Sequence, residues 1–247
     1  MKGKLSAIFK AAAFPAVMTV ISFVLFVAVY LFVTVTAVEP YYFAGLLFLL
    51  PSACFGAITH FTVTGELKTA VSSGITAAGI LVFGVASLVG FTALAFSAAT
   101  TTTTDTGKYA RVLMLSNYPD NKLIQCFPDR IPDNAKDVMF RYHPACLQGG
   151  ENFELKFKTD SAVLRSEADK YSRKAKWTGK MGDSEAEKHG VISGALGELG
   201  YYDLPADFTI YLMESEPYQP GDWNHGKVSL VAVSRQRNEI IFHAEDW

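Results

Sequence analysis

The chain has 247 residues and a net charge of −2, and half of its residues are hydrophobic. Residues 1–104 carry only four lysines and two glutamates, which leaves 18 of the 22 basic and 22 of the 24 acidic residues for the rest of the chain. The resulting charge of −4 on the C-terminal part argues against nucleic acid as a partner, because phosphate binding needs clustered Lys and Arg.

Three long apolar stretches in the first 98 residues predict transmembrane helices at about residues 14–38, 41–63 and 75–96. The three stretches contain no Asp, Glu, Lys or Arg. Each is about as long as the ~20 apolar residues that a membrane-spanning helix needs. Their lack of charge argues against transport, since ion pathways through a membrane usually carry ionisable groups.

The first apolar stretch has an alternative interpretation as a cleaved signal peptide. Lysines precede it, and the small residue Ala37 lies where a processing site could be. However, its apolar core is longer than the ~7 to 15 residues that are typical of a signal peptide. We therefore expect this stretch to be kept as a membrane anchor.

The basic residues that flank the three spans predict their orientation. Three lysines precede the first span and Lys68 lies in the second loop, whereas the first loop has no basic residue. The positive-inside rule then places the N-terminus in the cytoplasm. Three spans in the cell membrane would leave the C-terminal domain outside, although Lys108 and Arg111 oppose this bias.

Beyond the third span the pattern changes twice. Residues 99–108 contain five consecutive threonines, lack helical periodicity and predict a linker. Residues 109–247 consist of short β-rich runs separated by turn residues, and they predict a soluble domain. Strands are expected at residues 111–115, 123–127, 138–143, 153–158, 208–213, 228–234 and 240–244. The alternation in residues 153–158 indicates a sheet with one solvated face.

Two helices are expected between the fourth and fifth strands. The first follows a cap at Thr159 or Asp160 and places Leu164, Ala168, Tyr171 and Ala175 on one face. The second covers residues 184–199, where three glycines imply close packing or a break near Gly190. This order predicts an α+β domain with an antiparallel sheet and both helices on one face.

The first helix is expected to end in a basic cluster. Lys170, Arg173, Lys174 and Lys176 would complement the negative carbonyl end of the helix dipole. This explains the charges without a ligand. The functional alternative is a site for a phosphate or a lipid headgroup.

Cys126 and Cys146 are the only cysteines of the predicted soluble domain. Outside the cell they could form a disulfide, and the alternative is two free thiols. As a nucleophile Cys146 would need a base such as His143, but no protease signature surrounds this pair. His143 and Cys146 supply half of a metal-ligand set, so we expect no metal and no cofactor.

The loop at residues 216–226 combines aromatic and polar side chains, a composition that is often found in recognition loops. Tyr218, Trp223 and His225 are therefore the predicted binding residues. The alternative is that the loop folds back on its own aromatic rings.

Known catalytic motifs, including the nucleophile elbow and the phosphate loop, are absent from the sequence. We therefore expect a domain, anchored in the lipid bilayer, that binds, senses or scaffolds without catalysis. Its partner would be another membrane or envelope protein. The alternatives are an extracytoplasmic hydrolase with an unrecognised site and an accessory subunit of a membrane complex.

Overall fold

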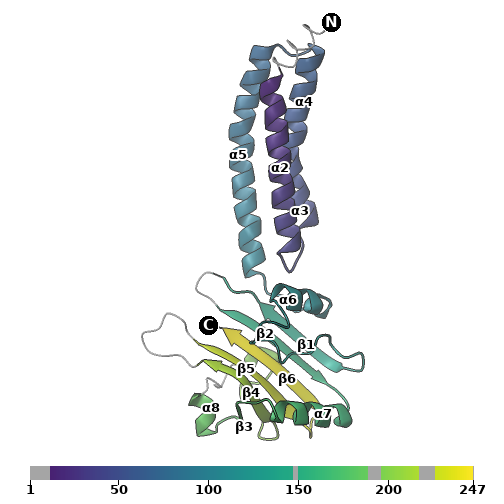
Figure 1. Cartoon of the computed structure of the whole chain (residues 1–247), viewed down its shortest axis with the longest axis vertical. Coiled ribbons are helices and arrows are strands. Elements are labelled where there is room, and N and C mark those ends of the chain that lie inside the picture. Colours follow the sequence, from purple (N-terminus) through teal and green to yellow (C-terminus); the bar gives the residue numbers. More distant parts are fainter. Residues whose placement is uncertain (1–11, 147–149, 189–195, 217–225, 247) are drawn as a thin grey trace. The chain divides into compact units, whose positions relative to one another are not determined.

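A computed structural model describes residues 12–146, 150–188, 196–216 and 226–246 of the chain (Figure 1). The chain divides into two compact units, which we name the helical unit, Met1–Ala98, and the sheet unit, Ala99–Trp247.

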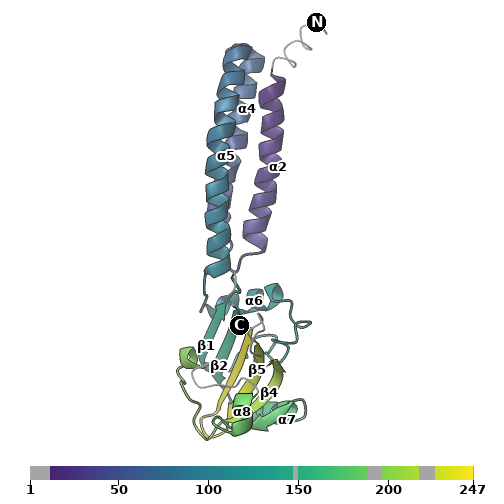
Figure 2. The ribbon, with the colours of Figure 1, turned by 90° about the vertical axis from the view of Figure 1, so that its left-hand side faces the viewer.

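The helical unit contains the three long apolar helices that the sequence predicts (Figures 1 and 2). The first is α2 (Ala13–Val35), and the third is α5 (Thr69–Thr100). The second is built from α3 (Tyr42–Leu46), η1 (Leu47–Leu49) and α4 (Leu50–Thr64). All three are long and apolar enough to cross a membrane.

Small and hydroxylated residues hold the three helices together. Ser52 Oγ of α4 donates to Thr19 O of α2 at 3.2 Å. Thr62 Oγ1 of α4 donates to Ser72 Oγ of α5 at 2.8 Å, and both side chains are buried. Such contacts stabilise helix pairs in a bilayer, where apolar surface alone gives little driving force for association.

The sheet unit is built on six antiparallel strands in the order β1-β2-β6-β5-β4-β3 (Figure 1). The strands are β1 (Lys136–His143), β2 (Glu151–Lys158), β3 (Trp177–Gly179), β4 (Thr209–Glu216), β5 (Lys227–Ser234) and β6 (Glu239–Asp246). The helices are η2 (Thr106–Lys108), α6 (Tyr109–Leu115), α7 (Ser161–Ser172), α8 (Ser184–Lys188) and η3 (Gly197–Leu199). The predicted antiparallel sheet is therefore present.

Helical segments cover both faces of this sheet. On one face, Tyr171 of α7 packs edge-on against Phe242 of β6. On the other face, Ala186 of α8 and Leu199 of η3 belong to a buried cluster that includes Ile241, the neighbour of Phe242 in β6. The expectations of both helices on one face and of a solvated second face are therefore wrong. The reason is non-local, because the segment after β3 returns across the second face.

Two of the expected strands are also wrong. Residues 111–115 belong to α6, in which Tyr109, Val112 and Leu113 are buried at the i, i+3 and i+4 spacing of a helix. Residues 123–127 form turns, and their apolar side chains Leu123 and Ile124 are buried as anchors. Short apolar runs do not distinguish a strand from a helical turn by periodicity alone.

The later elements agree better with the sequence. The predicted strands at 138–143, 153–158, 208–213, 228–234 and 240–244 correspond to β1, β2, β4, β5 and β6. Among the strands in the described residues, only the three-residue β3 lacks a prediction. The first predicted helix is α7, although Ala175 lies beyond its end. Of the second, the structure describes α8 and η3, and residues 189–195 lie outside the described part.

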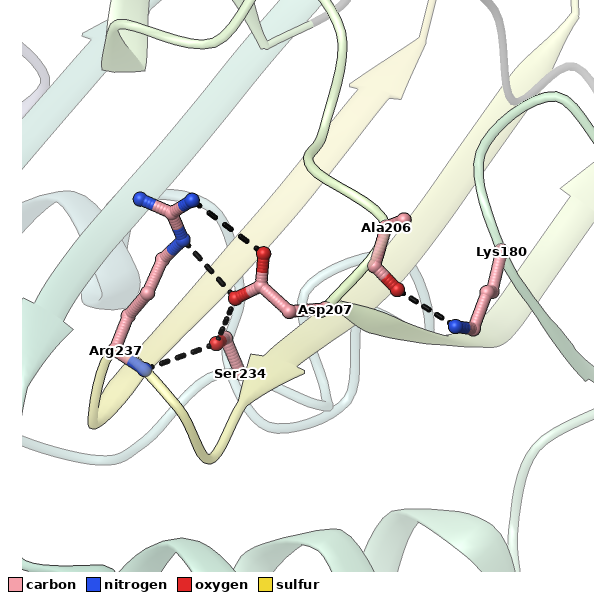
Figure 3. A network of polar contacts seen from close by, with 5 residues as sticks. All are labelled: Lys180, Ala206, Asp207, Ser234 and Arg237. Atoms are coloured by element: carbon pink, nitrogen blue, oxygen red, sulfur yellow. Dashed lines mark hydrogen bonds and ion pairs between the residues drawn. The ribbon is translucent and has the colours of Figure 1, made fainter.

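A polar cluster fixes the turn between β5 and β6 (Figure 3). Asp207 Oδ2 accepts hydrogen bonds from Ser234 Oγ at 2.5 Å and from Arg237 Nε at 3.0 Å. Asn238 takes the positive φ of 53° that this tight turn requires, which Asn tolerates better than most residues. The predicted hairpin around residues 236–238 is therefore confirmed.

Candidate functional site

The three predicted binding residues lie outside the described part of the chain. Tyr218, Trp223 and His225 fall within residues 217–225. Their role as a binding surface therefore stays a prediction.

Cys126 and Cys146 are free thiols in the structure, so the disulfide alternative is not realised there. Cys126 is buried, and its Sγ lies 3.3 Å from Ser229 Oγ on β5. Cys146 follows β1, which is separated from β5 by β2 and β6. Three strand spacings amount to about 14 Å, whereas a disulfide needs Cα atoms about 4.4–6.8 Å apart.

His143 has a partner other than Cys146, because its Nδ1 lies 2.8 Å from Thr102 Oγ1. The described residues contain no group of three or more His, Cys, Asp or Glu that could hold a metal ion.

The strand register places a row of charged residues across the buried second face of the sheet. Arg141 of β1 lies opposite Glu154 of β2, which lies opposite His243 of β6. His243 Nδ1 is 3.4 Å from Glu154 Oε1, and His243 Nε2 is 3.5 Å from Glu245 Oε2. Arg141 completes the row at 3.9 Å from Glu154 and 3.5 Å from Glu198.

This row is buried at its centre and reaches the surface at its ends. The side chains of Glu154 and His243 are 0% exposed, whereas those of Arg141 and Glu198 are 28% and 63% exposed. His243 lies within ion-pair distance of the carboxylates of Glu154 and Glu245. However, neither the Glu154 carboxylate nor either ring nitrogen of His243 makes a hydrogen bond with a described residue. The centre of the row is closed to a ligand, and we interpret it as an electrostatic feature of the fold.

Two opposing effects act on the pKa of His243. Burial lowers the pKa, but the neighbouring carboxylates of Glu154 and Glu245 outweigh burial and raise it above its ordinary value of 6.5. The imidazolium form is therefore favoured between these carboxylates. The sequence carries no signal for this row, because the alternation around Glu154 predicts a solvent-exposed side chain.

An open cleft lies on the opposite face of the sheet, between α7, the sheet and the segment at residues 118–132. We name it the α7 cleft. It has a volume of about 410 Å³. Its floor is formed by the buried rings of Phe127, Phe157 and Phe242. Its rim includes Tyr118, Asp129, Val163, Glu167 and Lys170.

Two buried tyrosines hold the segment that forms one wall of the α7 cleft. Tyr109 of α6 donates its hydroxyl to Pro128 O at 2.7 Å. Tyr171 of α7 donates its hydroxyl to Cys126 O at 2.8 Å. Burial raises the pKa of both tyrosines, so both hydroxyls stay protonated and able to donate. The cleft is therefore part of a fixed architecture.

A smaller and more polar cavity adjoins the α7 cleft, and we name it the lysine pocket. Its volume is about 220 Å³. Gln125 and Lys170 line both cavities, so the two are neighbours at these residues. The remaining walls are Lys122, Cys126, Tyr171, Lys174, Met213 and Glu214.

The helical unit also contains a cavity, of about 400 Å³, between its three long helices. Its walls are almost entirely apolar and include Phe26, Phe55 and Phe83. Specific ligand sites combine an apolar lining with a few polar groups that fix orientation. The polar side chains in this lining are those of Ser22 and Ser87, and no charged residue is among the described lining residues. The α7 cleft, which combines aromatic rings with charged groups, is therefore the better candidate.

Comparison with protein-family models, curated proteins and solved structures finds no match to the chain. The α7 cleft and the lysine pocket are therefore the features on which a function can be based.

Proposed function

We propose that this protein is a membrane-anchored binding domain whose ligand occupies the α7 cleft. Its three apolar helices lie in the cell membrane with the N-terminus in the cytoplasm, and its sheet unit lies outside. The protein binds, senses or scaffolds, and it does not turn over a substrate.

The α7 cleft is the observation that carries this proposal. Its volume of about 410 Å³ falls within the ~300–1,000 Å³ of small-molecule sites. Its aromatic floor offers apolar contact, and Asp129, Glu167 and Lys170 on its rim offer charge. This combination of apolar lining and few polar groups is typical of ligand sites.

The polar groups around the cleft favour binding over covalent catalysis. Cys126, which lines the adjoining pocket, is the nearest thiol, and burial raises its pKa to about 12. A thiol with that pKa is almost fully protonated at neutral pH and is a poor nucleophile. The Tyr118 hydroxyl donates to Phe127 O at 3.3 Å, and burial also raises the pKa of this phenol.

A variant that fills the cleft tests the proposal. Val163 lines the cleft from α7 and is partly exposed, so Val163→Trp places a large ring in the cleft without replacing a buried residue. Arg165 is exposed on the same helix and does not line the cleft, so Arg165→Trp is the matched control.

The measurement is a thermal-shift screen of small molecules against the full chain in nanodiscs. A ligand at 100 times its Kd stabilises the folded state by about 2.7 kcal/mol. We expect ligands that raise the melting temperature of the wild type and of Arg165→Trp but have no effect on Val163→Trp. Equal stabilisation of all three proteins by every hit would contradict the proposal.

A further inference from the structure

The lysine pocket carries an excess of positive charge. The carboxylate of Glu214 is ion-paired at 2.5 Å with Lys176, which does not line the pocket. Of the three lysines that line it, Lys170 is paired with Glu167 at 2.9 Å. Lys122 and Lys174 form no ion pair with a described residue.

The end of α7 compensates only part of this charge. The carbonyl groups at a helix C-terminus carry about half a negative charge. Three lysine charges, less one for the pair with Glu167 and half for the helix end, leave roughly one and a half positive charges around the pocket. A basic helix end that only balanced the helix dipole would not leave this excess. The field in the pocket therefore favours an anion and repels a cation.

The shape of the combined cavity adds a second requirement. The lysine pocket adjoins the α7 cleft, whose floor is aromatic, and Gln125 and Lys170 line both. A ligand that fills both cavities therefore has a charged end and an apolar body. The lysine pocket, at about 220 Å³, has room for one compact head group.

We propose that the α7 cleft and the lysine pocket together bind the head group and one chain of an anionic amphiphile. Its carboxylate or phosphate group lies among Lys122, Lys170 and Lys174, and its chain lies over Phe127, Phe157 and Phe242. This inference rests on the proposed function, since it requires the α7 cleft to be the binding site.

The test is isothermal titration calorimetry of the full chain in phosphatidylcholine nanodiscs, with empty nanodiscs as the blank. The probes are octanoate, octyl phosphate and octylammonium, which share a chain and differ in head group. We expect both anions to bind and octylammonium not to bind. A repeat in phosphatidylglycerol nanodiscs separates two sources of the ligand. Weaker octanoate binding there indicates that a bilayer lipid enters the site. Unchanged binding indicates a free amphiphile. Either result is consistent with the proposed chemistry.

Paired lysine variants locate the head group. We expect Lys122→Gln combined with Lys174→Gln to weaken octanoate binding about tenfold or more, because the loss of even one charged contact is worth roughly a factor of ten. The control is Lys136→Gln combined with Lys227→Gln, which removes the same charge from strand ends that do not line either cavity. The control pair is expected to leave the affinity within about twofold.

Two results would overturn the inference, namely octylammonium binding as tightly as octanoate, or equal weakening by the two lysine pairs. The Val163→Trp variant then distinguishes this failure from failure of the proposed function. If Val163→Trp abolishes binding of the probe, the cleft is a site and only the ligand class is wrong. If Val163→Trp leaves binding unchanged, the proposed function fails as well.

Discussion

The buried pair of His243 and Glu154 makes the stability of the sheet unit depend on pH. The groups that face His243 are Glu154 on β2 and Glu245 on β6, and Arg141 on β1 lies behind Glu154. Because the folded-state pKa of His243 is raised above 6.5, its protonation contributes stability that is fully present below pH 6.5. This contribution is lost as the pH rises through the folded-state pKa.

We therefore expect the free energy of unfolding of the wild type to fall as the pH rises above 6.5 and through the raised pKa of His243. In His243→Gln the decrease of the unfolding free energy with pH is expected to be smaller. His143→Gln, which changes a histidine outside the row, is expected to show the same decrease as the wild type. Urea unfolding followed by tryptophan fluorescence measures the three curves. Identical pH dependence in the wild type and His243→Gln would show that another group titrates.

Glu154 is expected to be among the most sensitive residues of the sheet unit. Removal of one partner from a buried ion pair typically costs about 3–5 kcal/mol, because it leaves an uncompensated charge. Glu154→Gln should approach this range at pH 6. Glu198→Gln removes the exposed end of the same row and should cost at most about 1 kcal/mol. Equal losses of unfolding free energy in the two variants would contradict the structural interpretation.

At the scale of elements, the turn between β5 and β6 depends on Asp207. Its hydrogen bond from Ser234 and, to a lesser extent, its contact with Arg237 lower the pKa of this carboxyl. The pH dependence of stability is therefore opposite to that for His243. The Asp207 carboxylate contributes stability above its ordinary pKa of 3.8, and this contribution is lost as the pH falls through the folded-state pKa.

The expected result is that Asp207→Asn lowers the urea midpoint of the sheet unit at pH 7. The matched control is Asp203→Asn at an exposed position of the same connecting segment, which should leave the midpoint unchanged. The difference between the two variants should shrink as the pH falls below 3.8 and through the lowered pKa of Asp207, because the wild-type carboxylate becomes protonated over that range. A midpoint of Asp207→Asn equal to that of Asp203→Asn would argue against the turn cluster.

The sequence predicts elements well where their pattern is local and poorly where distant segments decide. The strict alternation in β2 and the long apolar run of β5 indicate strands directly. The burial of Glu154 could not be predicted, because it depends on η3 and on β6, which follow much later in the chain. The α7 cleft could not be predicted either, because its lining residues Gln125 and Phe127 lie in a turn segment where the sequence predicts a strand.

At the scale of the whole molecule, composition alone predicts the division of the chain. The concentration of charge after residue 104 separates an apolar N-terminal part from a charged C-terminal part. The structure has three long apolar helices followed by an antiparallel sheet, in that order. The orientation in the membrane depends on the flanking lysines, and it decides whether the α7 cleft meets ligands outside the cell or in the cytoplasm.

Cysteine labelling in intact cells tests this orientation most directly. Cys54, Cys126 and Cys146 are first replaced by Ser, and single cysteines are then placed at two exposed positions. Gln236→Cys lies in the turn between β5 and β6, and Glu66→Cys lies between the second and third long helices. We predict that a membrane-impermeant maleimide labels Gln236→Cys before lysis and Glu66→Cys only after lysis. The opposite pattern, with Glu66→Cys labelled in intact cells and Gln236→Cys protected, would contradict an extracytoplasmic binding domain.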